Sequence, residues 1–319
     1  MLTVRHSTFY KYANPVTLGD HRMMIRPRDS HDMRLLNTRL MIRPQPSSIR
    51  WLHDVFGNSV AIASFNTTAT ELQIVSEIDL DHFERSEPDC PIEAYAATYP
   101  FSYSANEAPD LTRLIERSYP DPGHALDLWA KRFVRTDGPT ETLAMLTAIT
   151  QTIKSEFKYL PRDLEGVQTP IETLRIGNGS CRDFAVLMMG AARTLGLAAR
   201  FVTGYLYSPV LESNVGGGAT HAWVQIYLPG AGWVEFDPTN GIVGNRDLIR
   251  VAVVRDPAQA VPIAGTWIGV PADFLGMTVE VSVSSRPPAT TANANTTAPV
   301  VPSPTTPSPI TQSPPEPPH

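Results

Sequence analysis

The amino-acid sequence predicts an α+β fold, in which an antiparallel β domain precedes a domain that packs a central buried helix on an antiparallel sheet. In residues 1–85, short runs of apolar and β-branched residues lie between turn residues, as strands do. From His124 the apolar residues recur at three- and four-residue intervals, which is the period of an amphipathic helix. Strand-like runs return after Gly196, and strands that follow helices are typical of an α+β domain.

The antiparallel β domain is expected over residues 1–85. The runs TFYKY, MRLLNTRLMIRP and ELQIVSEIDL each have strand character. The run HDVFGNSVAIASF predicts two short strands around a Gly-Asn turn. Residues 86–123 are rich in proline and acidic residues, so we expect a connector that wraps a surface. Cys90 falls in this connector without a recognisable partner, and we interpret it as incidental.

The second domain is expected over residues 124–285, including a trailing segment of strands. The runs HALDLWAKRFV and ETLAMLTAITQTIKSEFKY predict helices. The run TPIETLRIG predicts a shorter helix, because Thr169 and Glu172 form the pattern of a capping box. Pro170 suits the first position of that helix, which should end at Gly177.

The C-terminal residues 286–319 have a different composition. They contain eleven prolines in 34 residues and no Phe, Tyr or Trp. Such a segment cannot form a packed core, so we expect a disordered tail with polyproline character.

The charge of the chain restricts the classes of function. The net charge of -6 and the pI of about 5.8 argue against nucleic acid as a partner. The charge is uneven, with a net +6 over residues 1–50 and a net -11 over residues 51–130. We interpret this as two solvated or mutually docked faces rather than an anionic-ligand patch, because the arginines are scattered at strand-like intervals.

The sequence contains no recognisable membrane or export signal. The N-terminal run MLTVRHSTFYKY lacks the apolar segment of a signal peptide, and no apolar run is long enough to span a bilayer. We therefore expect a cytoplasmic protein with no membrane partner, in a reducing compartment where thiols stay free.

Cys181 is the first candidate functional residue. It follows the small, flexible run Gly-Asn-Gly-Ser and opens the apolar stretch that ends near Leu195, which predicts a buried helix stopped by Gly196. A lone cysteine on an apolar helix is usually a small buried hydrophobe. A helix start is different, because its free backbone N–H groups and dipole favour the thiolate, which is the nucleophilic form.

A nucleophilic thiol requires a base and a group that orients the base. His221 opens the strand HAWVQIYL, and Asp237 lies near the end of the strand GWVEFDPT. If Leu228 faces Gly232 across the turn, Asp237 faces Trp223 and lies diagonal to His221 on the same face. A one-residue slip would put the two side chains on opposite faces. Each residue alone also has a structural interpretation, as a strand cap or a turn former.

These runs resemble a known family. GSCRDFA, LGLAARFVTGYL and THAWVQIYLPGAGWVEFDPT are similar to the bacterial branch of the transglutaminase-like superfamily, and TFYKYANPV with RPR resembles the β domain that precedes the catalytic domain there. RDPAQAVPIAGTWIG resembles its trailing segment. The resemblance implies a papain-like fold and a Cys–His–Asp triad at Cys181, His221 and Asp237.

The expected chemistry is acyl transfer or hydrolysis at peptide or side-chain amides through a thioester. We expect the backbone N–H of Cys181 to stabilise the oxyanion, with a second donor at Gln151 or Tyr159. Trp223 is expected either to wall the acyl site or to serve only in packing.

Three alternatives remain at this point. Water as the acceptor gives a protease or amidase, whereas an amine gives a transglutaminase. A binding or scaffold module with an inactive site belongs to another class of function. Zinc bound by Cys181, His221 and Asp237 is disfavoured, because the chain lacks paired short-range ligands. We therefore expect no cofactor and no metal.

Overall fold

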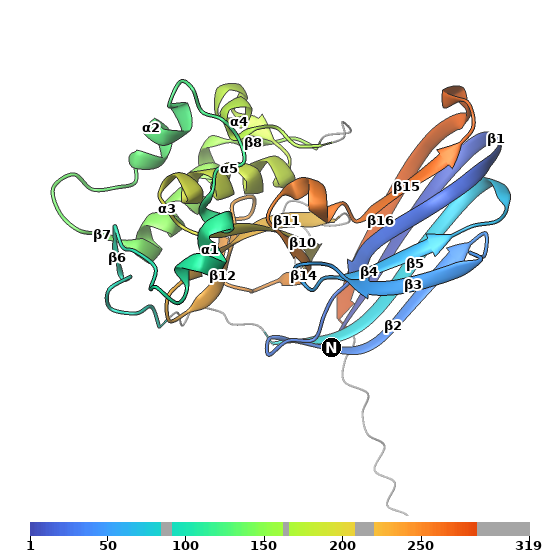
Figure 1. Ribbon diagram of the computed structural model, residues 1–319, viewed down its shortest axis with the longest axis horizontal. Coiled ribbons are helices and arrows are strands. Elements are labelled where there is room, and N and C mark those ends of the chain that lie inside the picture. The colour runs from blue at the N-terminus through green and yellow to red at the C-terminus, as the bar shows by residue number, and fades with distance from the viewer. Residues whose placement is uncertain (84–90, 162–165, 208–219, 286–319) are drawn as a thin grey trace, which may run out of the picture. The chain divides into compact units, whose positions relative to one another are not determined.

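The computed structural model describes residues 1–83, 91–161, 166–207 and 220–285. Cys90 and the tail predicted over residues 286–319 lie outside these ranges. The described chain is an α+β protein with a seven-stranded and a five-stranded antiparallel sheet and two short two-stranded ladders. Figure 1 shows how the two large sheets and the helices are arranged.

The N-terminal sheet is built around one long strand. Its first strands are β1 (Leu2–Arg26), β2 (Met33–Arg43), β3 (Ser48–His53), β4 (Ser59–Ser64) and β5 (Thr68–His82), in the order β2-β5-β1-β4-β3. The turn between β3 and β4 contains Gly57 and Asn58, as predicted. Register shifts along β1 bend it, so that its first half pairs mainly with β5 and its second half with β4.

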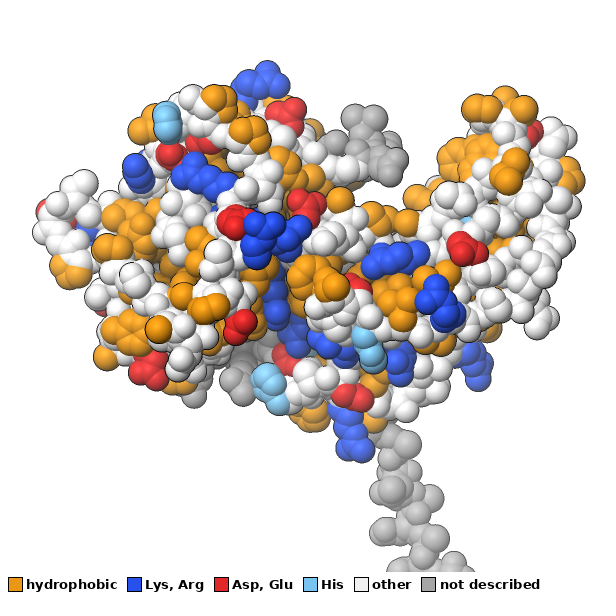
Figure 2. Space-filling model, viewed as in Figure 1, with side chains coloured by type: hydrophobic (Ala, Val, Ile, Leu, Met, Phe, Trp, Pro, Cys, Tyr) orange, Lys and Arg blue, Asp and Glu red, His pale blue; other side chains and the backbone are white. Residues whose placement is uncertain are grey.

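The end of the described chain returns to the same sheet. Strands β15 (Ile263–Ile268) and β16 (Phe274–Ser285) both pair with β1 in antiparallel register (Figure 1). This differs from the expected division, which assigned the trailing strands to the second domain. Ile268, Val270 and Leu275 are exposed at the end of this hairpin, where apolar side chains gather on the surface (Figure 2).

The second sheet has the order β13-β12-β11-β10-β14. Its strands are β10 (Ala199–Leu206), β11 (His221–Leu228), β12 (Gly232–Asp237), β13 (Ile242–Val243) and β14 (Leu248–Val254). The helices beside it are α1 (Ala108–Ile115), α2 (Ala125–Lys131), α3 (Thr142–Glu156), α4 (Pro170–Ile176) and α5 (Cys181–Thr194). The shorter elements are β6 (Thr98–Tyr99), β7 (Thr140–Glu141), β8 (Lys158–Tyr159), β9 (Asn178–Gly179), η1 (Pro257–Ala260) and η2 (Pro271–Asp273).

Helix α5 is the buried central helix that the sequence predicts. It packs on β11 and β10, with α2, α3 and α4 around it (Figure 1). Phe184, Leu187 and Met188 are almost completely buried in the main apolar cluster. Burial of one such side chain stabilises the fold by about 1.5–3 kcal/mol. This packing holds the N-terminus of α5, and therefore Cys181, at a defined position.

Helix α4 delivers the chain to α5 as predicted. Thr169 and Glu172 form a capping box, and Gly177 ends the helix with φ 74°. A positive φ is accessible to glycine at little cost, so the chain can turn sharply after α4.

The connector lies against the second sheet. The Tyr103 hydroxyl donates to the carbonyl of Tyr227 at 3.0 Å and accepts from the N–H of Ala198 at 2.8 Å. The Thr142 hydroxyl donates to the carbonyl of Ala96 at 2.7 Å. These contacts tie residues 96–103 to the strands and to the start of α3.

Candidate active site

Cys181 occupies the first position of α5, directly after the N-cap residue Ser180. The carboxylate of Asp183 accepts the backbone N–H and the hydroxyl of Ser180, both at 2.8 Å. Its other oxygen accepts the N–H of Gln168 at 2.7 Å. Asp183 therefore fixes the turn before α5 by three hydrogen bonds, and Cys181 stays 7 % exposed.

The turn before Cys181 is also held by a short parallel ladder. Lys158 pairs with Asn178 and Tyr159 pairs with Gly179. A Cβ at Gly179 would lie 2.8 Å from the Cβ of Asp183, so the turn needs glycine there. This ladder brings Tyr159 near Cys181. Burial, with a smaller electrostatic contribution from Cys181, raises the pKa of Tyr159 to about 12.

His221 and Asp237 meet across the β11–β12 hairpin. Leu228 pairs with Gly232 and Val224 pairs with Phe236, which is the register that the prediction required. The Nε2–H of His221 donates to Oδ2 of Asp237 at 2.8 Å, and both side chains are fully buried.

Asp237 has further donors in the turn that follows it. The amide of Asn240 donates to Oδ2 at 2.9 Å, and the N–H of Thr239 donates to Oδ1 at 2.9 Å. Sequence reasoning missed these two residues. The signal was the run DPTN, because Asp before proline commonly accepts backbone N–H groups in a turn.

The charges of the pair explain the two pKa shifts. Burial lowers the pKa of His221, but the charge and hydrogen bond of Asp237, with a smaller contribution from Cys181, outweigh it and raise the pKa to about 10. Burial raises the pKa of Asp237, but His221 and the hydrogen bonds from Asn240 and Thr239 leave it below its ordinary value. The arrangement favours imidazolium beside carboxylate.

The two ring nitrogens of His221 differ in their hydrogen bonding. Nδ1 is buried and makes no conventional hydrogen bond to the residues that the structure describes. Cys181 is close enough to raise the pKa of His221. His221 thus has one nitrogen engaged by Asp237, while its ring also interacts with the Cys181 side chain.

Gln151 and Trp223 are the other two residues predicted for the site. Gln151 on α3 donates its amide to the carbonyl of Gly241 at 2.8 Å, next to Asn240. Trp223 is 0 % exposed and donates its indole N–H to Glu235 at 2.6 Å. Its ring lies 5.9 Å from that of His221 at 30°, so it packs beside the imidazole.

Comparison with known families agrees with this architecture. Residues 2–81 match the bacterial transglutaminase-like N-terminal region, and residues 129–238 match the transglutaminase-like superfamily core. The chain belongs to the transglutaminase-like superfamily. The core match spans Cys181, His221 and Asp237.

Full-length relatives of this transglutaminase-like chain occur in mycobacteria. The uncharacterized protein ML0607 of Mycobacterium leprae is 27% identical over 284 residues, which is 88% of this chain and 98% of the relative. The uncharacterized protein Rv2569c of Mycobacterium tuberculosis is 27% identical over 277 residues, covering 82% of this chain and 86% of the relative.

A solved structure shares the fold of this transglutaminase-like protein. A candidate cysteine protease from Cytophaga hutchinsonii matches with a TM-score of 0.65 and 20% identity, covering 90% of this chain and 92% of that chain. Its coverage includes both the β domain and the papain-like core.

The described residues contain no group of three or more His, Cys, Asp and Glu side chains that could hold a metal ion. No helix in the described ranges is long and apolar enough to cross a bilayer.

Proposed function

We propose that the protein is a cysteine-dependent enzyme that cleaves or transfers the acyl group of peptide or side-chain amides through a thioester. The observation that carries this proposal is the position of His221 between Cys181 and Asp237. One ring nitrogen is bound by Asp237, and the ring also interacts with the Cys181 thiol at the N-terminus of α5. A structural histidine does not require this arrangement.

In the first step the Cys181 thiolate attacks the amide carbonyl carbon, and the carbonyl becomes an oxyanion. The tetrahedral intermediate then collapses, and the C–N bond breaks. His221 gives its proton to the leaving amine or ammonia, so that a neutral leaving group departs and the thioester remains on Cys181. Asp237 holds the ring in orientation throughout and stabilises its charged form.

The oxyanion needs hydrogen-bond donors. The backbone N–H of Cys181 at the start of α5 is the first. Tyr159 is the better second donor, because it lies near Cys181 and its raised pKa keeps the hydroxyl protonated. The amide of Gln151 already donates one of its two N–H groups to the Gly241 carbonyl, which holds it beside that residue.

Water is the acceptor that we favour in the second step. Water needs no additional binding site, whereas transglutamination requires an amine site and exclusion of water from the thioester. His221 removes the proton of the attacking water, the C–S bond breaks, and the acid is released as the thiolate re-forms. An inactive binding module is the competing function.

The first experiment is intact-mass spectrometry after brief iodoacetamide treatment between pH 4 and pH 9. It compares the wild type with His221→Ala, and a Cys181→Ser variant reports any labelling at Cys90. We expect rapid labelling of Cys181 well below the ordinary thiol pKa of about 8.5, lost in His221→Ala. Peptide amides with and without an added primary amine then distinguish hydrolysis from transfer.

The opposite result would reject the enzyme. Labelling that rises only above pH 8 and is unchanged in His221→Ala would identify an ordinary thiol. The binding module would then be the better description of the protein.

A further inference from the structure

A pocket of about 360 Å³ lies on the second sheet, and Cys181 is not part of its lining. Its lining includes Arg200 on β10, Gln225 on β11 and Glu235 on β12, which are directly paired across the three strands. Their sequence neighbours pack in the α5 cluster, as Phe201 and Val224 do. Because side chains alternate along a strand, these three project from the face opposite α5. None of the triad residues lines the pocket.

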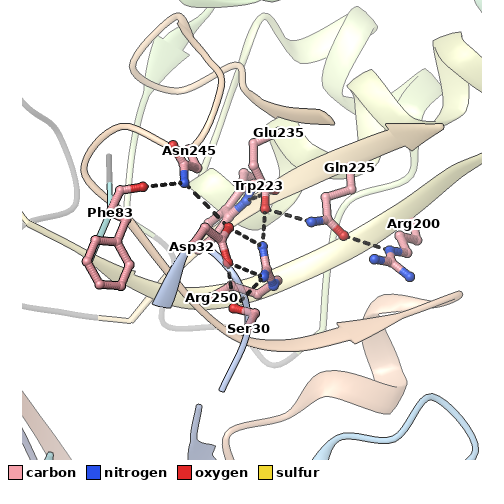
Figure 3. Close-up of polar contacts among 9 residues, drawn as sticks. All are labelled: Ser30, Asp32, Phe83, Arg200, Trp223, Gln225, Glu235, Asn245 and Arg250. Atoms are coloured by element: carbon pink, nitrogen blue, oxygen red, sulfur yellow. Dashed lines mark hydrogen bonds and ion pairs between the residues drawn. The ribbon is translucent and has the colours of Figure 1, made fainter. Parts of the chain in front are cut away.

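A chain of hydrogen bonds crosses the floor of the pocket (Figure 3). The Nε–H of Arg200 donates to the amide oxygen of Gln225 at 2.6 Å, and the Gln225 amide donates to Glu235 at 2.6 Å. Glu235 also accepts the indole N–H of Trp223 and, at 2.7 Å, the guanidinium of Arg250. The floor is therefore a preorganised polar surface.

The carboxylates that line the pocket already have donors. Asp32 accepts from Arg250 at 3.2 Å and from the Ser30 hydroxyl at 2.5 Å (Figure 3). Asp29 accepts the N–H of Leu35 at 2.5 Å. Together with Glu235, each acidic group is engaged, so the lining does not need a cation from outside.

The cations are not balanced in the same way. Arg250 is held between two carboxylates, Glu235 and Asp32. Arg200 is paired with neither. Its guanidinium lies 4.0 Å from the Trp233 ring, and in the described residues its only conventional hydrogen bond is the one to Gln225. Arg28 also lines the pocket, and its guanidinium makes no hydrogen bond or ion pair with the described residues.

The pKa shifts of Arg200 and Arg250 agree with this difference in their pairing. Burial lowers the pKa of Arg200 to about 9; Glu235 opposes the shift, while the charges of Arg250 and Arg28 add to it. Burial also lowers the pKa of Arg250, but Glu235 and Asp32 outweigh that effect and raise it. Arg200 is thus a partly buried cation that feels one carboxylate and two other arginines, and an anion beside it would offset the repulsion from those arginines.

We propose that this pocket binds a small polyanion bearing carboxylate or phosphate groups, held by Arg200 and Arg28. The terminal nitrogens of a guanidinium match two oxygens of either group in a bidentate contact. The volume suits a small metabolite, since ligand pockets begin near about 300 Å³. The proposal does not depend on the reaction at Cys181.

Isothermal titration calorimetry with citrate and with inorganic pyrophosphate tests this pocket on the full chain at low salt. We expect at least one probe to bind with one-to-one stoichiometry and to weaken as salt is added. Citrate alone would identify a carboxylate ligand, and pyrophosphate alone a phosphate ligand. Arg200→Gln should lower the affinity at least tenfold. Arg113→Gln, which removes the same charge from an exposed helix position, should leave it unchanged.

Two results would overturn the proposal. One is the absence of binding by both probes to the wild type. The other is equal affinity in the wild type and Arg200→Gln. If circular dichroism shows that Arg200→Gln does not fold, Arg28→Gln removes an exposed cation of the same pocket. It should weaken binding at least threefold, and unchanged affinity would also reject the site.

Discussion

The Nε2 atom of His221 lies 2.8 Å from Oδ2 of Asp237, at the end of a hairpin whose register places the two side chains diagonally. Both are buried, and Asp237 receives three further hydrogen bonds, two from Asn240 and one from Thr239. The carboxylate is therefore fixed before it acts on the imidazole. The effect of this carboxylate on the reactivity of Cys181 can be measured without a substrate.

Replacing Asp237 by Asn should slow alkylation of Cys181 strongly. An amide can present an N–H to Nε2 and so stabilise the wrong imidazole tautomer, and it does not stabilise imidazolium. We expect the iodoacetamide rate at pH 6 to fall about 10²-fold or more, within the range typical of lost acid–base assistance. Asp137→Asn is the control, because Asp137 is 76 % exposed in an ion pair with Arg135. A rate in Asp237→Asn equal to that of the control would contradict a role for Asp237.

The His221–Asp237 pair should make stability depend on pH. The pKa of His221 is raised from 6.5 to about 10, so its contribution is fully present below pH 6.5 and is lost as the pH rises toward 10. The lowered pKa of Asp237 acts at the other end, where its contribution is lost as the pH falls through its folded value, below 3.8. Urea unfolding of the wild type and His221→Gln at pH 6, 8 and 10 measures the difference. We expect the advantage of the wild type to shrink with rising pH, and a constant difference would count against an imidazolium.

Replacing Glu235 by Gln should destabilise the fold, although Glu235 makes no direct hydrogen bond to Cys181, His221 or Asp237 in the described chain. Glu235 accepts from Trp223, Gln225 and Arg250 in a buried position. The amide leaves Arg250 with less compensation and puts N–H groups where an acceptor is needed, at a cost of about 3 kcal/mol. Urea unfolding measures this loss in the free energy of unfolding. In Glu77→Gln the loss should stay below about 1 kcal/mol, because Glu77 makes only long, partly exposed ion pairs. Equal losses in the two variants would show that the Glu235 network adds little.

Gly204 to Ala should be destabilising although glycine has no side-chain contacts to lose. A Cβ there would lie 2.1 Å from the carbonyl oxygen of Ile249 and 2.7 Å from the Trp223 ring. Overpacking of this kind costs about 1–3 kcal/mol. Gly123→Ala is the matched control, because a Cβ at Gly123 would meet nothing within 4 Å. Chemical denaturation of both variants is the measurement, and similar midpoints would show that β10 and β14 shift freely.

Local sequence determined several features of this protein. The capping box of Thr169 and Glu172 and the glycine stop at Gly177 involve residues within one helix length. The β11–β12 hairpin has only three residues between its strands, so its turn sets the register and brings His221 and Asp237 together. These features depend on short-range geometry, and a single sequence is enough to predict them. The start of α5 at Cys181 is of the same kind.

Other features were decided only by tertiary structure. The pairing of β15 and β16 with β1, the contact of Tyr159 with the turn before Cys181, and the link from Arg250 to Asp32 join residues far apart in the chain. Strand periodicity shows which residues face a core, but not which of several strands is the neighbour. That choice depends on loop closure and on the packing of complementary faces, which no local run of residues encodes. The contact of His221 with Asp237 and the place of Cys181 at a helix start were therefore predictable from the sequence, whereas the surroundings that set the pKa values of His221 and Asp237 and the pocket at Arg200 required the folded chain.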